Sequence, residues 1–255
     1  MQQPEKVLVE AHPSVAIVYC ATNPLNLLMA VYDEGYRGGK GPYPLAANLI
    51  GGNPDIKHND KSPLEVLVRE VEEEFDPNFQ KQHPHTNQFN QEVVWAHPND
   101  IGFIQRHILG NLAPLQDFYV QAQEFGLGTA SYSAIYSAFL SGISKHAFDI
   151  ARSNLANGKT LTTEGLSGIF SLVQLEQDPR EEFATAHATA PIINYFLNSG
   201  IPYPEQIQAT PIGEPRNTFQ EYLRDFEYSR QVKPNHNNPQ KLDPSFHETV
   251  FGKQE

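Results

Sequence analysis

The sequence has 255 residues, with 18 Lys and Arg against 30 Asp and Glu, a formal net charge of −12 and no basic stripe. This balance argues against a nucleic-acid backbone or an anionic membrane as the main partner. A single cysteine (Cys20), no apolar run near the roughly 20 residues that span a bilayer and no secretory signal pattern predict a soluble, cytoplasmic protein without an internal disulfide.

The first expected elements are two strands joined by a short turn. Residues 14–22 are β-branched and aromatic, which predicts a buried strand, and residues 27–32 should form its partner. The glycine-rich residues 33–41 follow, without the spacing of a P-loop. Two interpretations stay open there: a flexible surface loop, or a lid whose Arg37 or Lys40 meets a substrate phosphate.

A helix with strong start signals is expected after the glycine pair Gly51-Gly52 and a polar loop. Ser62 is the expected N-cap, Pro63 takes the first helical position, and Glu65 lies three residues after the cap, as in a capping box. The apolar residues of this helix recur at helical spacing and predict one face that packs on a core: Leu64, Leu67, Val68, Val71 and Phe75.

The same helix carries three carboxylates, Glu70, Glu73 and Glu74, at spacings of three and four residues on a different face. Like charges so placed cost an exposed helix roughly 0.2–0.5 kcal/mol per pair. A divalent cation with a preference for oxygen ligands, such as Mg²⁺ or Mn²⁺, would explain the cluster. The alternative is a solvated acidic face in which Arg69 forms ordinary ion pairs with Glu65 and Glu73.

The next segment is expected to be irregular and then helical. Residues 76–91 are rich in Asn, Gln, His and Pro and predict a long loop, in which His83 and His85 are expected at the surface rather than on a metal. Asn99-Asp100 is expected to cap a helix that runs to Leu109.

The second half of the chain alternates strands and helices. Residues 117–125 predict a strand; residues 132–140 fit a strand or a helix, with the strand favoured. Helices are expected over residues 145–155 and 183–197. A capping box opens a further short helix at residues 218–226, before a polar tail.

The central stretch resembles the Nudix box of the Nudix hydrolase family. Residues 69–74 match its Arg-Glu-apolar-x-Glu-Glu core position for position, and Gly51-Gly52 resembles its glycine pair. There are three departures: the loop before the helix is three residues longer, a box glutamate is replaced by Lys61, and the glycine after the helix is Asp76. In the family that glutamate helps to hold the arginine and the metal site, and a shift of the loop that brings Asp60 into its place is an open alternative. Aspartate tolerates the left-handed conformation expected at that last position better than most residues.

The resemblance implies an α/β fold, an α/β/α sandwich around a mixed sheet. Residues 1–200 would form the Nudix-like domain, with insertions at about 76–92 and 126–160, and residues 201–255 a C-terminal extension. By the same resemblance, Glu70, Glu73 and Glu74 would hold Mg²⁺ or Mn²⁺ and Arg69 would orient them. The implied accessory residues are Gly51, Gly52, Arg37 and Lys40 for substrate binding and Glu164 as a further catalytic acid.

The resemblance implies Mg²⁺-dependent hydrolysis of a diphosphate linkage in a nucleoside diphosphate derivative. One alternative, prompted by Lys61 and the longer loop, is a Nudix-like domain that binds a nucleotide or a protein partner without hydrolysing it. Another is a purely structural acidic helix in an unrelated fold. We expect a small phosphorylated molecule as the partner, with no nucleic acid and no membrane. The oligomeric state stays open, with a homodimer as one alternative.

Overall fold

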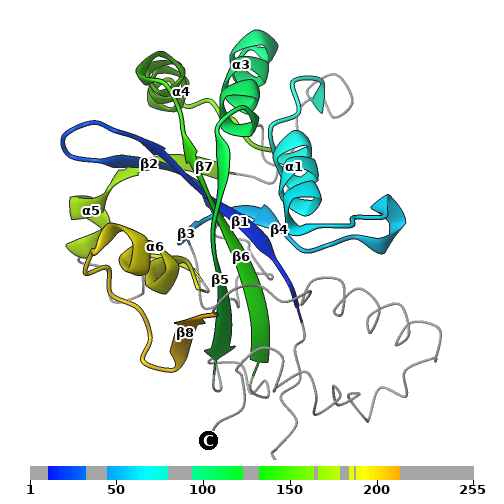
Figure 1. Ribbon diagram of the computed structural model, residues 1–255. Helices are drawn as coiled ribbons and strands as arrows, with labels where there is room; N and C mark the ends of the chain where they lie inside the picture. The colour runs from blue at the N-terminus through cyan, green and yellow to red at the C-terminus, as the bar shows by residue number, and fades with distance from the viewer. Residues whose placement is uncertain are drawn as a thin grey trace, which may run out of the picture.

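The structure is a computed structural model (Figure 1). It describes residues 11–32, 45–79, 94–122, 132–163, 166–178, 184–186 and 188–212. Several expectations fall outside these ranges: Arg37, Lys40, His83, His85, Glu164, the helix at residues 218–226 and the polar tail.

A mixed sheet forms the centre of the fold. Its strands are β1 (Ser14–Cys20), β2 (Asn26–Val31), β3 (Ala47–Asn48), β4 (Ile50–Gly52), β5 (Leu112–Ala122), β6 (Tyr132–Gly142), β7 (Leu166–Ser171) and β8 (Ile207–Pro211). The order is β3-β2-β1-β6-β5-β8, with β4 also paired to β1 and β7 to β2. β1 and β6 run parallel, whereas the other pairings of these strands are antiparallel.

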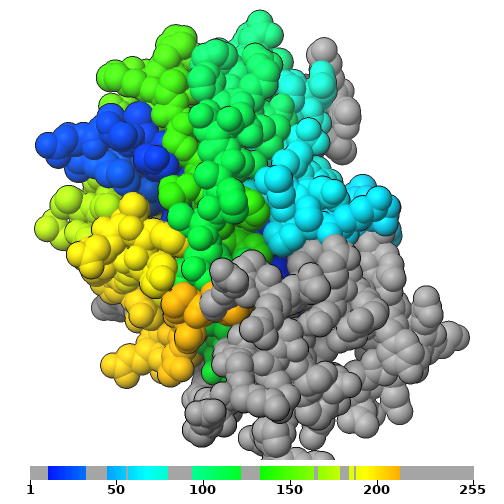
Figure 2. Space-filling model, viewed as in Figure 1, coloured from blue at the N-terminus to red at the C-terminus, as the bar shows by residue number. Residues whose placement is uncertain are grey.

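Two hydrophobic cores lie on opposite faces of this sheet. Because side chains alternate along a strand, Val15 and Ile17 of β1 enter one core, and Ala16 and Val18 enter the other. The first core includes residues of α5 (Leu172–Glu176) and α6 (Thr189–Leu197); the second includes residues of α1 (Pro63–Glu74), α3 (Pro98–Leu109) and α4 (Lys145–Ala156). The expected α/β/α arrangement is therefore confirmed, and in Figures 1 and 2 α6 and α1 lie on opposite sides of β5.

Most expected elements are confirmed, with shifted ends. Residues 132–140 belong to strand β6, so the helical alternative is wrong there. Helix α3 begins slightly earlier than expected: the N-cap is His97, two residues before Asn99, and its Nδ1 accepts a hydrogen bond from Asn99 N at 3.2 Å. The helix expected from residue 183 begins at Thr189.

Two strands belong to the central sheet although they lie in ranges expected as additions. β6 falls within the expected insertion at 126–160, yet it pairs with both β1 and β5. β8 falls within the expected extension at 201–255 and pairs with β5 over its whole length. Long-range strand pairing, which no local pattern encodes, places both in the sheet. None of the helices in the described ranges has the length and apolar character needed to cross a bilayer.

Candidate functional site

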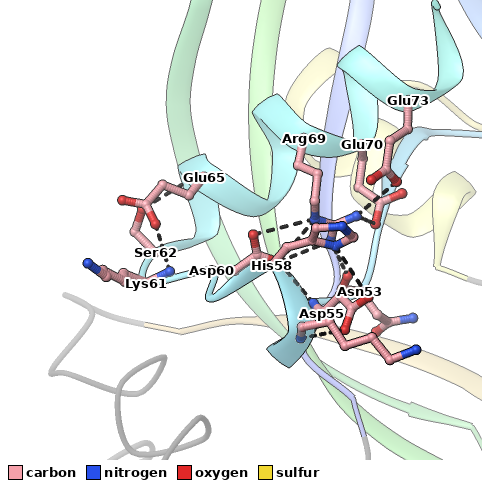
Figure 3. Close-up of polar contacts among 11 residues, drawn as sticks. Asn53, Asp55, His58, Asp60, Lys61, Ser62, Glu65, Arg69, Glu70 and Glu73 are labelled. Atoms are coloured by element: carbon pink, nitrogen blue, oxygen red, sulfur yellow. Dashed lines mark hydrogen bonds and ion pairs between the residues drawn. The ribbon is translucent and has the colours of Figure 1, made fainter.

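The start of α1 is fixed by two side-chain hydrogen bonds. Ser62 Oγ accepts from Glu65 N at 3.2 Å, as an N-cap should, and Pro63 occupies the first helical turn. Glu65 Oε2 accepts from Lys61 N at 2.7 Å rather than from Ser62 N, so the reciprocal bond of the expected capping box falls one residue earlier. The side chain of Lys61 points away from the carboxylates of α1 (Figure 3).

The buried stripe of α1 differs from the expected one at both ends and in its middle, where Val66 is buried in place of Val68, which is only partly buried. Its fully buried apolar residues are Val66, Leu67, Val71 and Phe75. Leu64 shares the angular position of this stripe, but it lies in the first turn and remains 47% exposed. Glu74, expected on the acidic face, lies within the stripe and is only 4% exposed.

Glu74 connects the helix to the glycine pair. Its Oε1 accepts a hydrogen bond from Gly51 N at 3.1 Å. Gly51 has φ +133°, and a Cβ there would lie 2.1 Å from the backbone oxygen of Ser14 on β1. Glycine is therefore required, because no other residue allows β4 to approach β1 this closely while its N–H faces the carboxylate.

Glu70 packs directly on the second glycine. A Cβ on Gly52 would lie 2.5 Å from both Cδ and Oε2 of Glu70. The side chain of Glu70 is only 14% exposed. The glycine pair and the acidic helix therefore meet in the structure: the carboxylate of Glu74 contacts Gly51, and that of Glu70 contacts Gly52.

Arg69 holds the cluster together (Figure 3). Its Nη1 lies 2.9 Å from Glu70 Oε1 and 3.0 Å from Glu73 Oε2. Its Nε and Nη2 donate to Asp60 Oδ2 at 3.2 and 3.0 Å, and Nη2 also donates to the carbonyl of Asn53 at 2.8 Å. Burial alone would lower the pKa of Arg69, but hydrogen bonds and the charges of Asp60 and Glu70 outweigh it and raise the pKa above its ordinary value.

Asp60 supplies a carboxylate to Arg69, which the side chain of Lys61 cannot do. The lengthened loop folds into a short 3₁₀ turn, η2 (Ile56–His58), and Asp60 Oδ2 accepts a hydrogen bond from Asp55 N at 2.9 Å across it. This closure buries Asp60 to 8% exposure beside Arg69. Asp60 is therefore an acidic partner of Arg69 that comes from outside the helix, one residue before Lys61.

The end of α1 is capped by residues far along the chain. Thr163 donates from N to Glu74 O at 2.8 Å and from Oγ1 to Glu73 O at 3.1 Å, while Gln105 Nε2 donates to Phe75 O at 2.8 Å. These bonds satisfy carbonyls that a helix end leaves open. The left-handed cap expected at Asp76 is wrong: Phe75 is the C-cap with φ −106°, and Asp76 has no positive φ.

Carboxylate oxygens are ligands that suit a cation such as Mg²⁺, but the carboxylates of α1 are not grouped around a common point in this structure. Within the described ranges, no three His, Cys, Asp or Glu side chains are grouped so that they could hold a metal ion. Arg69 bridges Glu70 and Glu73, and Glu74 is turned to Gly51. Glu73 is the exposed member, with 51% of its side chain accessible. The predicted metal site at these three glutamates therefore stays a prediction.

The structure brings together six of the nine expected site residues: Gly51, Gly52, Arg69, Glu70, Glu73 and Glu74. Arg37, Lys40 and Glu164 lie outside the described residues. Two features escaped the sequence pattern: the role of Asp60 and the backbone carbonyl of Asn53 on Arg69. The position of Asp60 next to the aberrant Lys61 was the available signal for the first.

Comparison with known proteins gives limited similarity. No protein-family model matches the sequence, and no curated protein matches it. NrtR from Shewanella oneidensis is similar in structure, at 13% sequence identity and a TM-score of 0.38, over 95% of this chain and 98% of that chain. A MutT/nudix family protein from Enterococcus faecalis is similar at 14% identity and a TM-score of 0.26, over 56% of this chain and 39% of that chain. TM-scores this low assign neither fold nor function.

Proposed function

We propose that this chain hydrolyses a diphosphate linkage in a nucleoside diphosphate derivative, with Mg²⁺ or Mn²⁺ held by Glu70, Glu73 and Glu74. The supporting observation is the way Asp60 and Asn53 hold Arg69 against Glu70 and Glu73. This arrangement compensates for Lys61, the departure that most weakens the motif. When bound, the cation would neutralise phosphate charge and lower the pKa of the attacking water.

The side chains of α1 have separate roles in this proposal. Arg69 fixes the carboxylates of Glu70 and Glu73 before any ligand arrives, so less ordering is needed on binding. Gly51 N holds the carboxylate of Glu74. Glu73 is the exposed member of the three proposed metal ligands, and its carboxylate would accept the proton of the attacking water. Glu164 is the alternative base, and Arg37 and Lys40 would contact the phosphates.

A second candidate is a domain that binds the same kind of ligand without hydrolysing it. The observation that favours it is the pairing of both Glu70 and Glu73 with Arg69, together with the lack of a grouped metal-binding set in the described ranges. Phosphate oxygens would then be recognised by cationic groups and backbone N–H groups rather than through a cation.

The test is a titration of Mg²⁺ and Mn²⁺ into the protein and into Glu73→Gln. Melting temperature and phosphate release from a panel of nucleoside diphosphate derivatives are recorded in parallel. Glu72→Gln is the matched control, because Glu72 is the exposed neighbour of Glu73 on the same helix. We expect metal stabilisation and turnover in the parent and in Glu72→Gln, and loss of both in Glu73→Gln. Binding of the nucleotides without turnover at any metal concentration would favour the second candidate.

A further inference from the structure

The last turn of α1 carries two of the three proposed metal ligands. Glu73 and Glu74 are the final residues of this helix, and its last turn contains no basic residue. The C-terminal end of a helix bears a partial negative charge, so two carboxylates there weaken the turn. Glu70, one turn earlier, adds like-charge repulsion. This turn therefore needs other groups to hold it in helical form.

The backbone carbonyls of the last turn are the place where such groups can act. A helix end leaves its last four carbonyls without a partner inside the helix. In α1 these are the carbonyls of residues 72–75, which follow the bond from Phe75 N to Val71 O at 3.0 Å. Each of the four accepts a hydrogen bond from one of two residues that are distant in the sequence, Gln105 and Thr163.

Thr163 supplies two of these bonds. Its Oγ1 donates to Glu73 O at 3.1 Å, and its N–H donates to Glu74 O at 2.8 Å. The segment that carries Thr163 is itself fixed, because Thr160 forms a β-bridge to the segment before α3 and Leu161 is fully buried in the core shared with α1. Thr163 therefore reaches the end of the helix from a fixed position.

Gln105 supplies the other two bonds from α3, which lies beside α1 (Figure 1). Its Nε2 donates to Phe75 O at 2.8 Å and, over a longer distance of 3.4 Å, to Glu72 O. Ile104 and Ile108 hold α3 in the same core, where both are fully buried. The N–H and O–H donors of the two capping residues place partial positive charge at the negative end of α1, where carboxylates are least favourable.

We propose that Gln105 and Thr163 are positioning residues for the cation site. They keep the last turn of α1 wound, so that Glu73 and Glu74 stay at helical spacing from Glu70. The proposal rests on the function proposed above, because it takes these glutamates as the metal ligands. A cation that met an unwound turn would have to rewind it on binding. The apparent metal affinity therefore falls in proportion to the fraction of molecules in which the turn is formed.

The test removes the side-chain donors and measures metal affinity. Thr163→Val and Gln105→Met keep the approximate size of each side chain but cannot donate to the carbonyls, whereas Thr163→Ser keeps the hydroxyl. Mg²⁺ and Mn²⁺ are titrated into the full chain by calorimetry. We expect binding to weaken about threefold in each single variant and about tenfold in the double variant, with parent affinity retained in Thr163→Ser.

Hydrogen exchange shows whether the turn itself has loosened. The amides of Glu74 and Phe75 should exchange faster in Thr163→Val and in Gln105→Met, in the absence of metal. Asn157→Ala is the matched control, because Asn157 Nδ2 donates to a carbonyl at the end of α4, that of Ser153, at 2.7 Å. It should lower the melting temperature by a similar amount, yet leave metal affinity and the exchange of both amides unchanged.

The outcomes separate failure of this proposal from failure of the metal site. If the parent binds either ion and all variants bind it equally well, the caps are only structural and the positioning role is overturned, while the metal site stands. If the parent binds neither ion, the metal site is refuted and the positioning role with it. A loss in Thr163→Val with none in Gln105→Met would also overturn the shared role, because it would assign the effect to Glu164, which follows Thr163 in the sequence.

Discussion

The two sides of α1 follow different rules. Its buried stripe can be predicted from the helical spacing of apolar residues within the segment itself, such as Leu67, Val71 and Phe75. Its charged side depends on partners elsewhere: Asp60 and Asn53 from the preceding loop, and the glycine pair of β4. The buried stripe packs the helix against the sheet, whereas the charged side keeps carboxylates close together that would otherwise repel one another. Stability should therefore depend mainly on the stripe, and ligand binding on the charged side.

The largest expected effect on stability comes from removing a large side chain from the buried stripe of α1. Phe75→Ala removes a fully buried ring and should lower the free energy of unfolding by about 3–5 kcal/mol. Leu64→Ala is the control from the same helix, and because Leu64 is half exposed it should cost less than about 1 kcal/mol. Urea unfolding measures both. Similar losses in the two variants would contradict the assignment of the stripe.

The next effect concerns the acidic partner of the arginine. Asp60→Asn removes a buried charge that accepts from Nε and Nη2 of Arg69, so the loss should be about 2 kcal/mol. Metal stabilisation should weaken as well, because Glu70 and Glu73 would no longer be held by a fixed guanidinium. Urea unfolding and the Mg²⁺ titration measure the two effects. An unchanged unfolding free energy would show that Asp60 does not hold Arg69.

Much of this division could be predicted from the sequence. Local patterns predicted the start of the helix, its N-cap Ser62 and most of its buried stripe, whereas the glycine pair was linked to the helix only by the family resemblance. Asp60 was visible in the sequence as a candidate beside Lys61, but its role could not be decided there, because it depends on a loop closure in which Asp55 N donates to Asp60. Glu74 was assigned to the wrong face, since spacing alone does not show that Gly51 N would donate a hydrogen bond to its carboxylate within the buried stripe.

The pairing of distant strands was also beyond the sequence. Ser14, Ser137 and Asp117 are brought together by the parallel pairing of β1 with β6 and by the register of β6 with β5. Register between distant strands follows from the packing of both faces, not from any motif within one strand. For the same reason, the central place of β6 in the sheet could not be read from its own residues.

A smaller expected effect tests the contact between glycine and carboxylate. Gly52→Ala places a methyl group against the flexible end of Glu70, which can move, so stability should fall by only about 1 kcal/mol. Metal stabilisation should nevertheless be lost, because the carboxylate is displaced. In a Glu70→Ala background the same substitution should be nearly neutral, and the difference between the two backgrounds measures the coupling. Additive effects would mean that Gly52 acts independently of Glu70.

The smallest effect is expected where the family pattern is most visibly broken. Lys61→Glu restores the box glutamate, but the Lys61 side chain is exposed and points away from the cluster (Figure 3). The unfolding free energy should change by no more than about 0.5 kcal/mol, as for other exposed charges. The same substitution should not rescue Asp60→Asn, because a side chain at position 61 does not reach Arg69 from where the backbone places it. A gain of tenfold or more in phosphate release with Lys61→Glu would show instead that the lysine restrains the site and that Asp60 replaces the box glutamate only in part.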